Sequence, residues 1–209
     1  PFPLGQTSAT VIKNSYGNID MLMAGYSSAT AYPQCFDLSN EQKEMEKQII
    51  IQKFFSQAEA YVNLLKPKFF MPFAGRYILA GKNCDLNNQR AVPELEEAYD
   101  YFISSKNIDQ TLTKCIILNS MSSFDITTGK ASDSYKRINQ EEKAEYVKNI
   151  LSKVKYDFEH EKDPETGDLE PLVQRCYERF ENKRKELRFS SDTSILLDFD
   201  DNILAISAN

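Results

Sequence analysis

The densest apolar stretch of the chain is rich in aromatic residues and follows Pro67. Proline lacks a backbone N–H and disfavours helix at the residue before it, so Pro67 ends the segment that precedes it. The aromatic run from Phe69 to Phe73 is typical of a strand that is buried on both faces of a sheet. Gly75 permits a turn, or a close backbone approach that a side chain would block. The pattern therefore predicts a central buried strand that runs into a tight turn.

A long amphipathic helix is predicted before this strand. Ser39 and Gln42 have the spacing of a capping box, in which each side chain bonds the other residue's backbone N–H. Apolar residues then recur every three or four positions: Ile50, Phe54, Ala58, Tyr61 and Leu65. Charged residues between them are expected to face water: Glu44, Lys47, Lys53 and Glu59. We expect this helix to span residues 40–65 and to face the core.

Further apolar runs alternate with helical patterns in the first part of the chain. Strands are expected at 19–24 and 113–119, and Pro93 begins a helix that ends near Ser104. Thr10-Val11-Ile12 is a candidate strand at a sheet edge. Polar segments predict loops at 83–90 and 122–134. We expect the three main strands to share one sheet that the two helices cover, which is a mixed α/β architecture.

The composition changes near Tyr135, after which basic and acidic residues balance. Asn139 and Glu142 form a second capping box, and a helix is expected to run on to about residue 156. A third long helix is expected to end near residue 185, with its apolar side chains facing inward: Leu172, Cys176 and Phe180. These two helices are expected to form a hairpin.

The last residues alternate between apolar and polar positions. Segments 193–198 and 203–207 flank Asp200-Asp201-Asn202, a pattern that predicts a β-hairpin. We therefore expect two parts, residues 1–134 and a helical and β-hairpin extension over 135–209.

The acidic composition argues against two classes of binding partner. The net charge is -6 and the sequence pI is about 5.0, which argues against binding to nucleic acid or to an anionic membrane. The four cysteines lie far apart, which excludes a zinc ribbon or a Cys-x-x-Cys redox motif: Cys35, Cys84, Cys115 and Cys176. Reduced cysteines and the lack of an apolar stretch of spanning length lead us to expect a cytoplasmic location.

Motifs that would carry catalysis within this chain are missing from the sequence. His160 lies in a charged segment, and the chain has no second imidazole to complete a metal or catalytic site. We find no Gly-x-Ser-x-Gly motif and no phosphate-cradling glycine loop. We therefore assign no catalytic residue and no metal ligand to this chain.

Polar side chains at two predicted turns are candidate substrate-binding residues. Ligands of α/β sheets collect at the carboxyl ends of strands, where Tyr26, Ser27 and Ser28 follow the strand at 19–24. The alternative for these three residues is an ordinary solvated turn.

Arginines after the central strand are candidates for binding an anionic substrate. Guanidinium groups bind carboxylate or phosphate through two parallel hydrogen bonds, so we place Arg76 and Arg90 near such a group, with Tyr77 beside them. Surface ion pairs are the alternative for both arginines.

Two blocks of sequence resemble the C-terminal half of metallo-β-lactamase-fold proteins. One is Met71-Pro72-Phe73-Ala74-Gly75-Arg76-Tyr77, a strand end with Pro-x-x-Gly and an aromatic residue. The other runs from Ile19 to Pro33, a strand followed by a loop of small residues and an aromatic-Pro pair. Both are similar to the branch that contains CMP-N-acetylneuraminate hydroxylase and related bacterial metal-dependent hydrolases. The resemblance implies the C-terminal half of an αββα sandwich, followed here by the helical hairpin and the C-terminal β-hairpin.

The metal ligands of that family do not occur in this sequence. Many members carry a metal-binding His in the turn after the strand, as Pro-x-His-x-Gly, where this chain has Ala74 before Gly75. The His-x-His-x-Asp-His cluster belongs to the N-terminal half of the fold. The resemblance implies zinc or iron in the full-length protein, held by a metal-binding half that we expect upstream of Pro1, and this chain alone is expected to be inactive.

Three functions remain open at this point. The first is the C-terminal portion of a metal-dependent hydrolase, which supplies one sheet and a wall for a small-molecule substrate. The second is part of an oxygenase that acts on a sugar-nucleotide of the CMP-sialic acid type. The third is a non-catalytic protein-interaction module. We expect the apolar sheet face to lie against the N-terminal metal-binding half, a second copy of the chain, or the helices from 139–185.

Overall fold

The computed structural model describes residues 6–162, 165–191, 194–199 and 202–207. The chain forms two compact units, Pro1–Lys155 and Tyr156–Asn209, and each is described by itself. This division lies later than the boundary that we expect after residue 134, because the segment up to Lys155 packs with the first unit.

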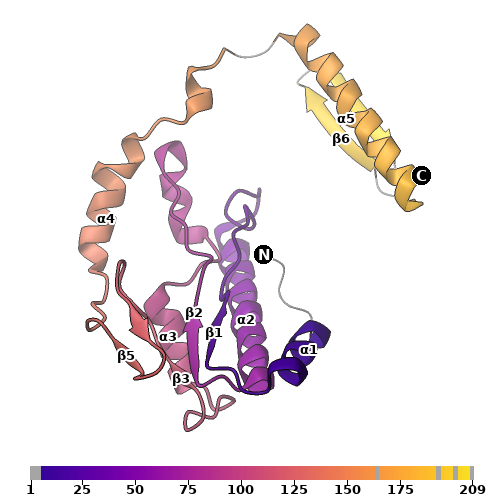
Figure 1. Ribbon diagram of the computed structural model, residues 1–209. Coiled ribbons are helices and arrows are strands. Elements are labelled where there is room, and N and C mark those ends of the chain that lie inside the picture. Colours follow the sequence, from indigo (N-terminus) through magenta and orange to yellow (C-terminus); the bar gives the residue numbers. More distant parts are fainter. Residues whose placement is uncertain (1–5, 163–164, 192–193, 200–201, 208–209) are drawn as a thin grey trace. The chain divides into compact units, whose positions relative to one another are not determined.

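Three parallel strands form the sheet of the first unit, in the order β1, β2, β3 (Figure 1). β1 spans Met21–Ala24, β2 spans Phe69–Pro72 and β3 spans Lys114–Cys115. The registers pair Leu22 with Phe70, and Phe70 with Cys115. The prediction that these three segments share one sheet is confirmed. β3 is shorter than predicted, because only two of its residues pair with β2.

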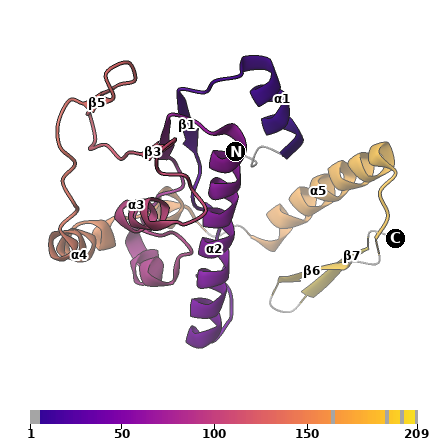
Figure 2. The same ribbon diagram turned by 90° about the horizontal axis from the view of Figure 1, so that it is seen from below.

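Two helices cover one face of this sheet. α2 (Asn40–Leu65) and α3 (Leu95–Ser104) lie on the same side of the strands in Figure 2. Their apolar side chains form the core together with residues of the strands and loops: Tyr26, Phe55, Ala58, Val62, Phe70, Ala98, Phe102, Ile108 and Cys115. The Phe102 ring meets the Phe70 ring edge to face, with centroids 4.9 Å apart. The expected arrangement of one sheet covered by two helices is confirmed.

The ends of α2 follow from its sequence. Gln42 N–H donates to Ser39 Oγ at 3.2 Å and Ser39 N–H donates to Gln42 Oε1 at 2.9 Å, which confirms the capping box. At the other end Lys66 adopts the left-handed conformation and its N–H donates to Val62 O. Pro67 follows directly, and proline cannot continue a helix.

The buried face of α2 is rotated from the predicted stripe. Ala58 and Leu65 are buried as expected, whereas Phe55 and Val62 fill positions next to the predicted Phe54 and Tyr61. Consecutive apolar residues, such as the Ile49–Ile51 run, offer two adjacent faces, so their spacing alone does not select one.

Glu59 of α2 was predicted to face water and is buried instead. Its carboxylate accepts hydrogen bonds from Ser105 Oγ and from Asn107 Nδ2, the latter at 3.3 Å. These bonds to the loop after α3 offset the cost of burying the carboxylate, so the side chain is held inside.

The prediction of an edge strand at residues 10–12 is wrong. These residues lie in α1 (Gln6–Tyr16), whose Ala9 is buried. Lys13 Nζ donates to Leu64 O at 2.6 Å, so α1 is joined to the last turn of α2. The donation satisfies a carbonyl that the end of α2 leaves without a helical partner.

Two segments predicted as loops contain regular structure. The first forms the 3-10 helix η1 (Gly81–Gln89), where Asn87 Oδ1 accepts from Leu79 N–H and Asn87 Nδ2 donates to Leu79 O, both at 2.9 Å. The second holds the antiparallel pair β4 (Phe124–Asp125) and β5 (Lys130–Ala131). The Phe124 ring packs edge to face on Phe69, with centroids 4.9 Å apart, so this hairpin covers part of the second face of the sheet.

α4 spans Gln140–Asn149, which is shorter than predicted, and η2 (Leu151–Lys153) follows it. The Asn139 side chain accepts hydrogen bonds from the N–H groups of Glu141 and Glu142, which places the helix start where the capping pattern predicts it.

The second unit contains η3 (Asp157–His160), α5 (Thr166–Leu187), β6 (Ser194–Phe199) and β7 (Asn202–Ser207). β6 and β7 pair antiparallel, which confirms the predicted β-hairpin; residues 200–201 of its turn, and residues 163–164 of the break before α5, lie outside the described residues. Leu172 and Cys176 were predicted to face inward and are exposed. α4 belongs to the first unit and α5 to the second, so the hairpin of these two helices stays a prediction.

Candidate functional site at the carboxyl ends of the strands

Two loops meet where β1 and β2 end. Loop 25–28 follows β1 and loop 74–77 follows β2, and parallel strands bring their carboxyl ends to the same edge of the sheet. Gly75 adopts a φ of +98°, and a Cβ at this position would lie 2.1 Å from Ser27 Oγ and 3.1 Å from Ser27 O. The close approach predicted for Gly75 is therefore present, and it joins the two loops.

Two hydroxyl groups are buried at this junction. Tyr26 is 1% exposed and Ser27 is 9% exposed. Neither hydroxyl has a hydrogen-bond partner among the described residues. Burial raises the pKa of Tyr26 to about 12, with Arg76 opposing the rise and Glu94 and Glu96 adding to it. Tyr26 is therefore a neutral phenol at neutral pH, able both to donate and to accept a hydrogen bond.

Charged side chains from α3 and α4 surround the second loop. Arg76 Nη2 lies 2.8 Å from Glu94 Oε2, and Lys143 Nζ pairs with the other oxygen of Glu94. Glu94 is the N-terminal capping residue of α3, where a carboxylate interacts favourably with the helix dipole. One carboxylate thus links loop 74–77 to α4.

Glu96 is a second carboxylate of this region, and it is 7% exposed. Its Oε1 accepts hydrogen bonds from Tyr135 OH at 2.8 Å and from Ile138 N–H at 2.9 Å. Its Oε2 is buried without a partner among the described residues. Burial opposes ionisation, but the hydrogen bonds from Ile138 and Tyr135 outweigh it and hold the pKa of Glu96 below its usual value. The carboxylate is therefore charged at neutral pH.

Tyr77 and Arg90 form a stacked pair next to loop 74–77. Tyr77 OH donates to Thr30 O at 2.9 Å and accepts from Gln34 Nε2 at 2.9 Å. The Arg90 guanidinium carbon lies 5.1 Å from the centroid of the Tyr77 ring, which is a cation–π distance. Burial lowers the pKa of Arg90, since the side chain is removed from water.

Five of the six predicted binding residues fall into two neighbouring groups. Tyr26, Ser27 and Arg76 lie at the junction of the two loops, while Tyr77 and Arg90 stack beside it. Ser28 is partly exposed, and Arg76 forms the ion pair that was its alternative reading. Their role in binding stays a prediction.

Several residues of this region were not predicted from the sequence: Glu94, Glu96, Tyr135 and Lys143. The cluster of acidic residues after Pro93 was a visible signal of a helix start, because carboxylates there interact favourably with the helix dipole. Their partners Tyr135, before α4, and Lys143, on α4, could not be predicted from the sequence, since they lie 39 and 49 residues away along the chain.

The donor groups of this chain do not fit a zinc or iron site by themselves. Over the described residues, no three His, Cys, Asp or Glu side chains gather closely enough to hold a metal ion. The sole histidine, His160, is exposed in η3, and Ala74 offers no ligand in the turn after β2.

Within the described residues, no helix has the length and apolar character required to span a membrane. Comparisons with protein-family models, with curated proteins and with solved structures found no match to this chain.

Proposed function

We propose that this chain is the C-terminal portion of a metal-dependent hydrolase with a metallo-β-lactamase fold, and that its two loops form one wall of the substrate site. The observation that carries the proposal is the contact of Ser27 with Gly75 at the carboxyl edge of a parallel sheet. Sites for small molecules in α/β folds lie at this edge.

The chemistry of this wall suits a small polar substrate. Tyr26 and Ser27 would offer neutral hydroxyls whose hydrogen bonds are not taken by other described residues. Arg76 is held by Glu94, so its free N–H groups would have a fixed direction for an anionic group of the substrate. In this proposal the zinc or iron is held by residues of an N-terminal half, and this chain supplies binding and orientation only.

A non-catalytic interaction module is the second candidate, and one observation favours it. Met23 of β1 is 47% exposed and Phe73, which directly follows β2, is 50% exposed. Exposed apolar residues on a sheet are typical of a surface that another polypeptide covers. The occupant would be the N-terminal metal-binding half in the first proposal, and a different partner or a second copy of this chain in the second.

The reading frame upstream of Pro1 provides the first test. A His-x-His-x-Asp-His cluster encoded there supports the hydrolase, and a start codon at the position of Pro1 supports the interaction module. The protein translated from the longer frame should contain stoichiometric zinc or iron by elemental analysis, whereas this chain alone should contain none after extensive washing.

Substitutions then test the wall in the longer protein. Arg76→Ala should lower kcat/KM on a hydrolysable ester or phosphodiester probe by about tenfold or more, because one charge-assisted hydrogen bond is lost. Arg137→Ala is the matched control, since Arg137 pairs with Asp100 on the exposed face of α3 and should leave hydrolysis unchanged. Equal loss in both variants, or no loss in either, would count against this assignment of Arg76.

A further inference from the structure

A cleft of about 880 Å³ opens on the first unit between α2, η1, the start of α3 and α4. Its volume lies in the range of small-molecule pockets, and all of its lining residues belong to the first unit. Apolar side chains of α2 and α4 form part of its wall, among them Ile51, Phe55 and Val147. Arg90 and Lys148 line the same cleft.

The charge of Arg90 is poorly compensated for a buried group. Arg90 is 6% exposed, and its Nε donates to Asn87 O at 3.0 Å. Within the part of the chain that the structure describes, no carboxylate oxygen lies within 4 Å of its guanidinium, and its two Nη atoms have no hydrogen-bond partner. The Tyr77 ring offsets part of the charge.

Two of the three lysines that line the cleft are paired with carboxylates, unlike Arg90. Lys143 pairs with Glu94, and Lys47 Nζ lies 3.1 Å from Glu44 Oε2. Lys148, on the exposed side of α4, has no carboxylate within ion-pair distance among the described residues. Asp85, Glu94 and Glu97 also line the cleft, but among the described residues none of their oxygens lies within 4 Å of a nitrogen of Arg90 or Lys148. These two side chains are therefore the cations of the cleft that form no ion pair in the described part of the chain.

We propose that this cleft binds a small organic anion, a phosphate or carboxylate carried on an apolar or aromatic body. The Arg90 guanidinium holds the oxyanion through its two Nη groups, and Lys148 adds charge at the rim. Ile51, Phe55 and Val147 contact the body. A buried guanidinium without a counter-ion is costly, and an oxyanion would supply charge-assisted hydrogen bonds in a partly desolvated site.

This inference does not rest on the proposed hydrolase. The cleft is formed by α2, η1, α3 and α4, and Arg76 and the buried hydroxyls of Tyr26 and Ser27 are not among its lining residues. It would hold equally for an interaction module that a metabolite regulates.

Isothermal titration calorimetry of the full chain tests the proposal, with phenyl phosphate and benzoate as the anionic probes and phenol as the neutral control. Saturable binding of one or both anions is expected, and which anion binds more tightly identifies the preferred head group. Arg90→Gln should weaken the affinity by tenfold or more, because a charge-assisted pair is lost. Lys148→Gln should weaken it by a smaller factor, about twofold to fivefold.

Arg137→Gln is the matched control, since it removes the same charge from the first unit at a site paired with Asp100 and outside the cleft. It should leave the affinity unchanged. Arg76→Gln locates the site: loss of binding in this variant with no loss in Arg90→Gln would place the anion at the carboxyl edge of the sheet and overturn the proposal.

Backbone NMR of the unsubstituted chain tests the same site without requiring that Arg90→Gln folds. Phenyl phosphate should shift amide signals of residues 87–92 and 143–148. Absence of saturable shifts, or shifts confined to other segments, would also overturn the proposal.

Discussion

The two loops at the carboxyl end of the sheet approach each other closely because Gly75 has no Cβ atom. Gly75→Ala places a methyl group 2.1 Å from Ser27 Oγ at a φ of +98°, where an alanine is strained even in open space. We expect a loss of about 2 to 4 kcal/mol in the free energy of unfolding, measured by urea denaturation.

Gly17→Ala is the matched control, because Gly17 has a φ of +67° and no atom within 4 Å of an added Cβ. It should cost roughly 1 kcal/mol, the conformational strain without the collision. Ser27→Ala combined with Gly75→Ala should recover part of the larger loss. Equal costs for the two glycine variants would show that the loops do not touch.

Tyr26 provides a test in alkaline solution. Its pKa is raised to about 12 by burial, against an ordinary value of 10.0, so between these pH values the unfolded chain loses a proton that the folded chain retains. The free energy of unfolding should therefore fall as the pH rises from 10 to 12, by on the order of 2 kcal/mol for this residue. Below pH 10 the phenol is protonated in both the folded and the unfolded chain, so Tyr26 does not reduce the free energy of unfolding there.

Tyr26→Phe should reduce this fall, and should leave stability near neutral pH unchanged or slightly higher, since the hydroxyl has no hydrogen-bond partner among the described residues. Tyr16→Phe, at an exposed position of α1, is the comparison. Denaturant titrations at several pH values measure the difference between variants, which removes the contribution of Cys115, whose pKa burial also raises to about 12. An identical pH dependence in both variants would contradict the burial of Tyr26.

Individual residues were predictable where their own chemistry restricts the backbone. Gly75 follows an aromatic strand and Pro72, so a turn or a close backbone approach could be predicted there. Glu59 was not predictable, because its burial depends on Ser105 and Asn107, which belong to a different element. The hydrogen bonds from Tyr135 and Ile138 to Glu96 could not be predicted either, because these partners also lie in a different element.

At the scale of elements, α2 should depend measurably on its first turn. Ser39→Ala removes the hydrogen bond from Gln42 N–H and half of the capping box. We expect a loss of about 1 kcal/mol in the free energy of unfolding. Ser56→Ala, at an exposed position in the middle of the same helix, should change it by less than about 0.5 kcal/mol.

Elements with strong local signals were predicted well, and elements made by long-range contacts were not. The capping box and Pro67 determine the bounds of α2, so its range was correct. β3 is defined only by pairing with β2, so its length could not be read from its apolar run. The β4–β5 hairpin depends on Asp125 accepting from the N–H groups of Thr127 and Thr128, a turn that its polar composition concealed.

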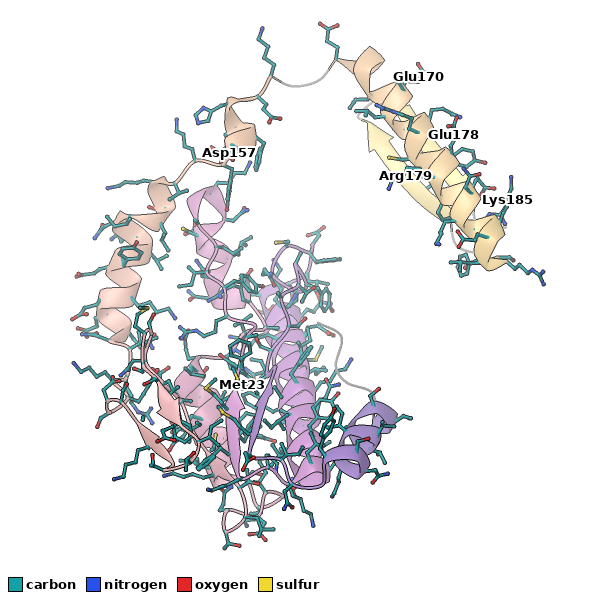
Figure 3. All side chains as sticks on the ribbon, in the orientation of Figure 1. Met23, Asp157, Glu170, Glu178, Arg179 and Lys185 are labelled. Atoms are coloured by element: carbon teal, nitrogen blue, oxygen red, sulfur yellow. The ribbon has the colours of Figure 1, made fainter. Side chains whose placement is uncertain are left out.

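At the scale of the whole chain, the sheet of the first unit exposes one large apolar side chain on β1. Met23, labelled in Figure 3, is 47% exposed, while its neighbours Leu22 and Ala24 pack against the core on the other face. If this face is covered by another polypeptide, as both proposed functions require, the isolated chain should associate as its concentration rises. Light scattering of the chain and of Met23→Glu measures this, and the variant should remain at lower mass.

Ile103→Glu is the control, since Ile103 is similarly exposed but lies on α3. It should associate like the unsubstituted chain. A chain that stays monomeric at all concentrations, and that shows no affinity for the metal-binding half, would remove the support for the half-enzyme and favour a module that binds another partner.

The parallel sheet also sets the order in which the chain can fold. Met21 pairs with Phe69, and Phe69 pairs with Lys114, so each ladder must close a long loop that contains a whole helix. β6 and β7 instead close a short turn, with Phe199 paired to Asn202. Hairpins of this kind form in microseconds, whereas non-local parallel pairing is slow. We therefore expect the central aromatic strand to find its strand partners later than β6 finds β7, since its two ladders span the segments that contain α2 and α3.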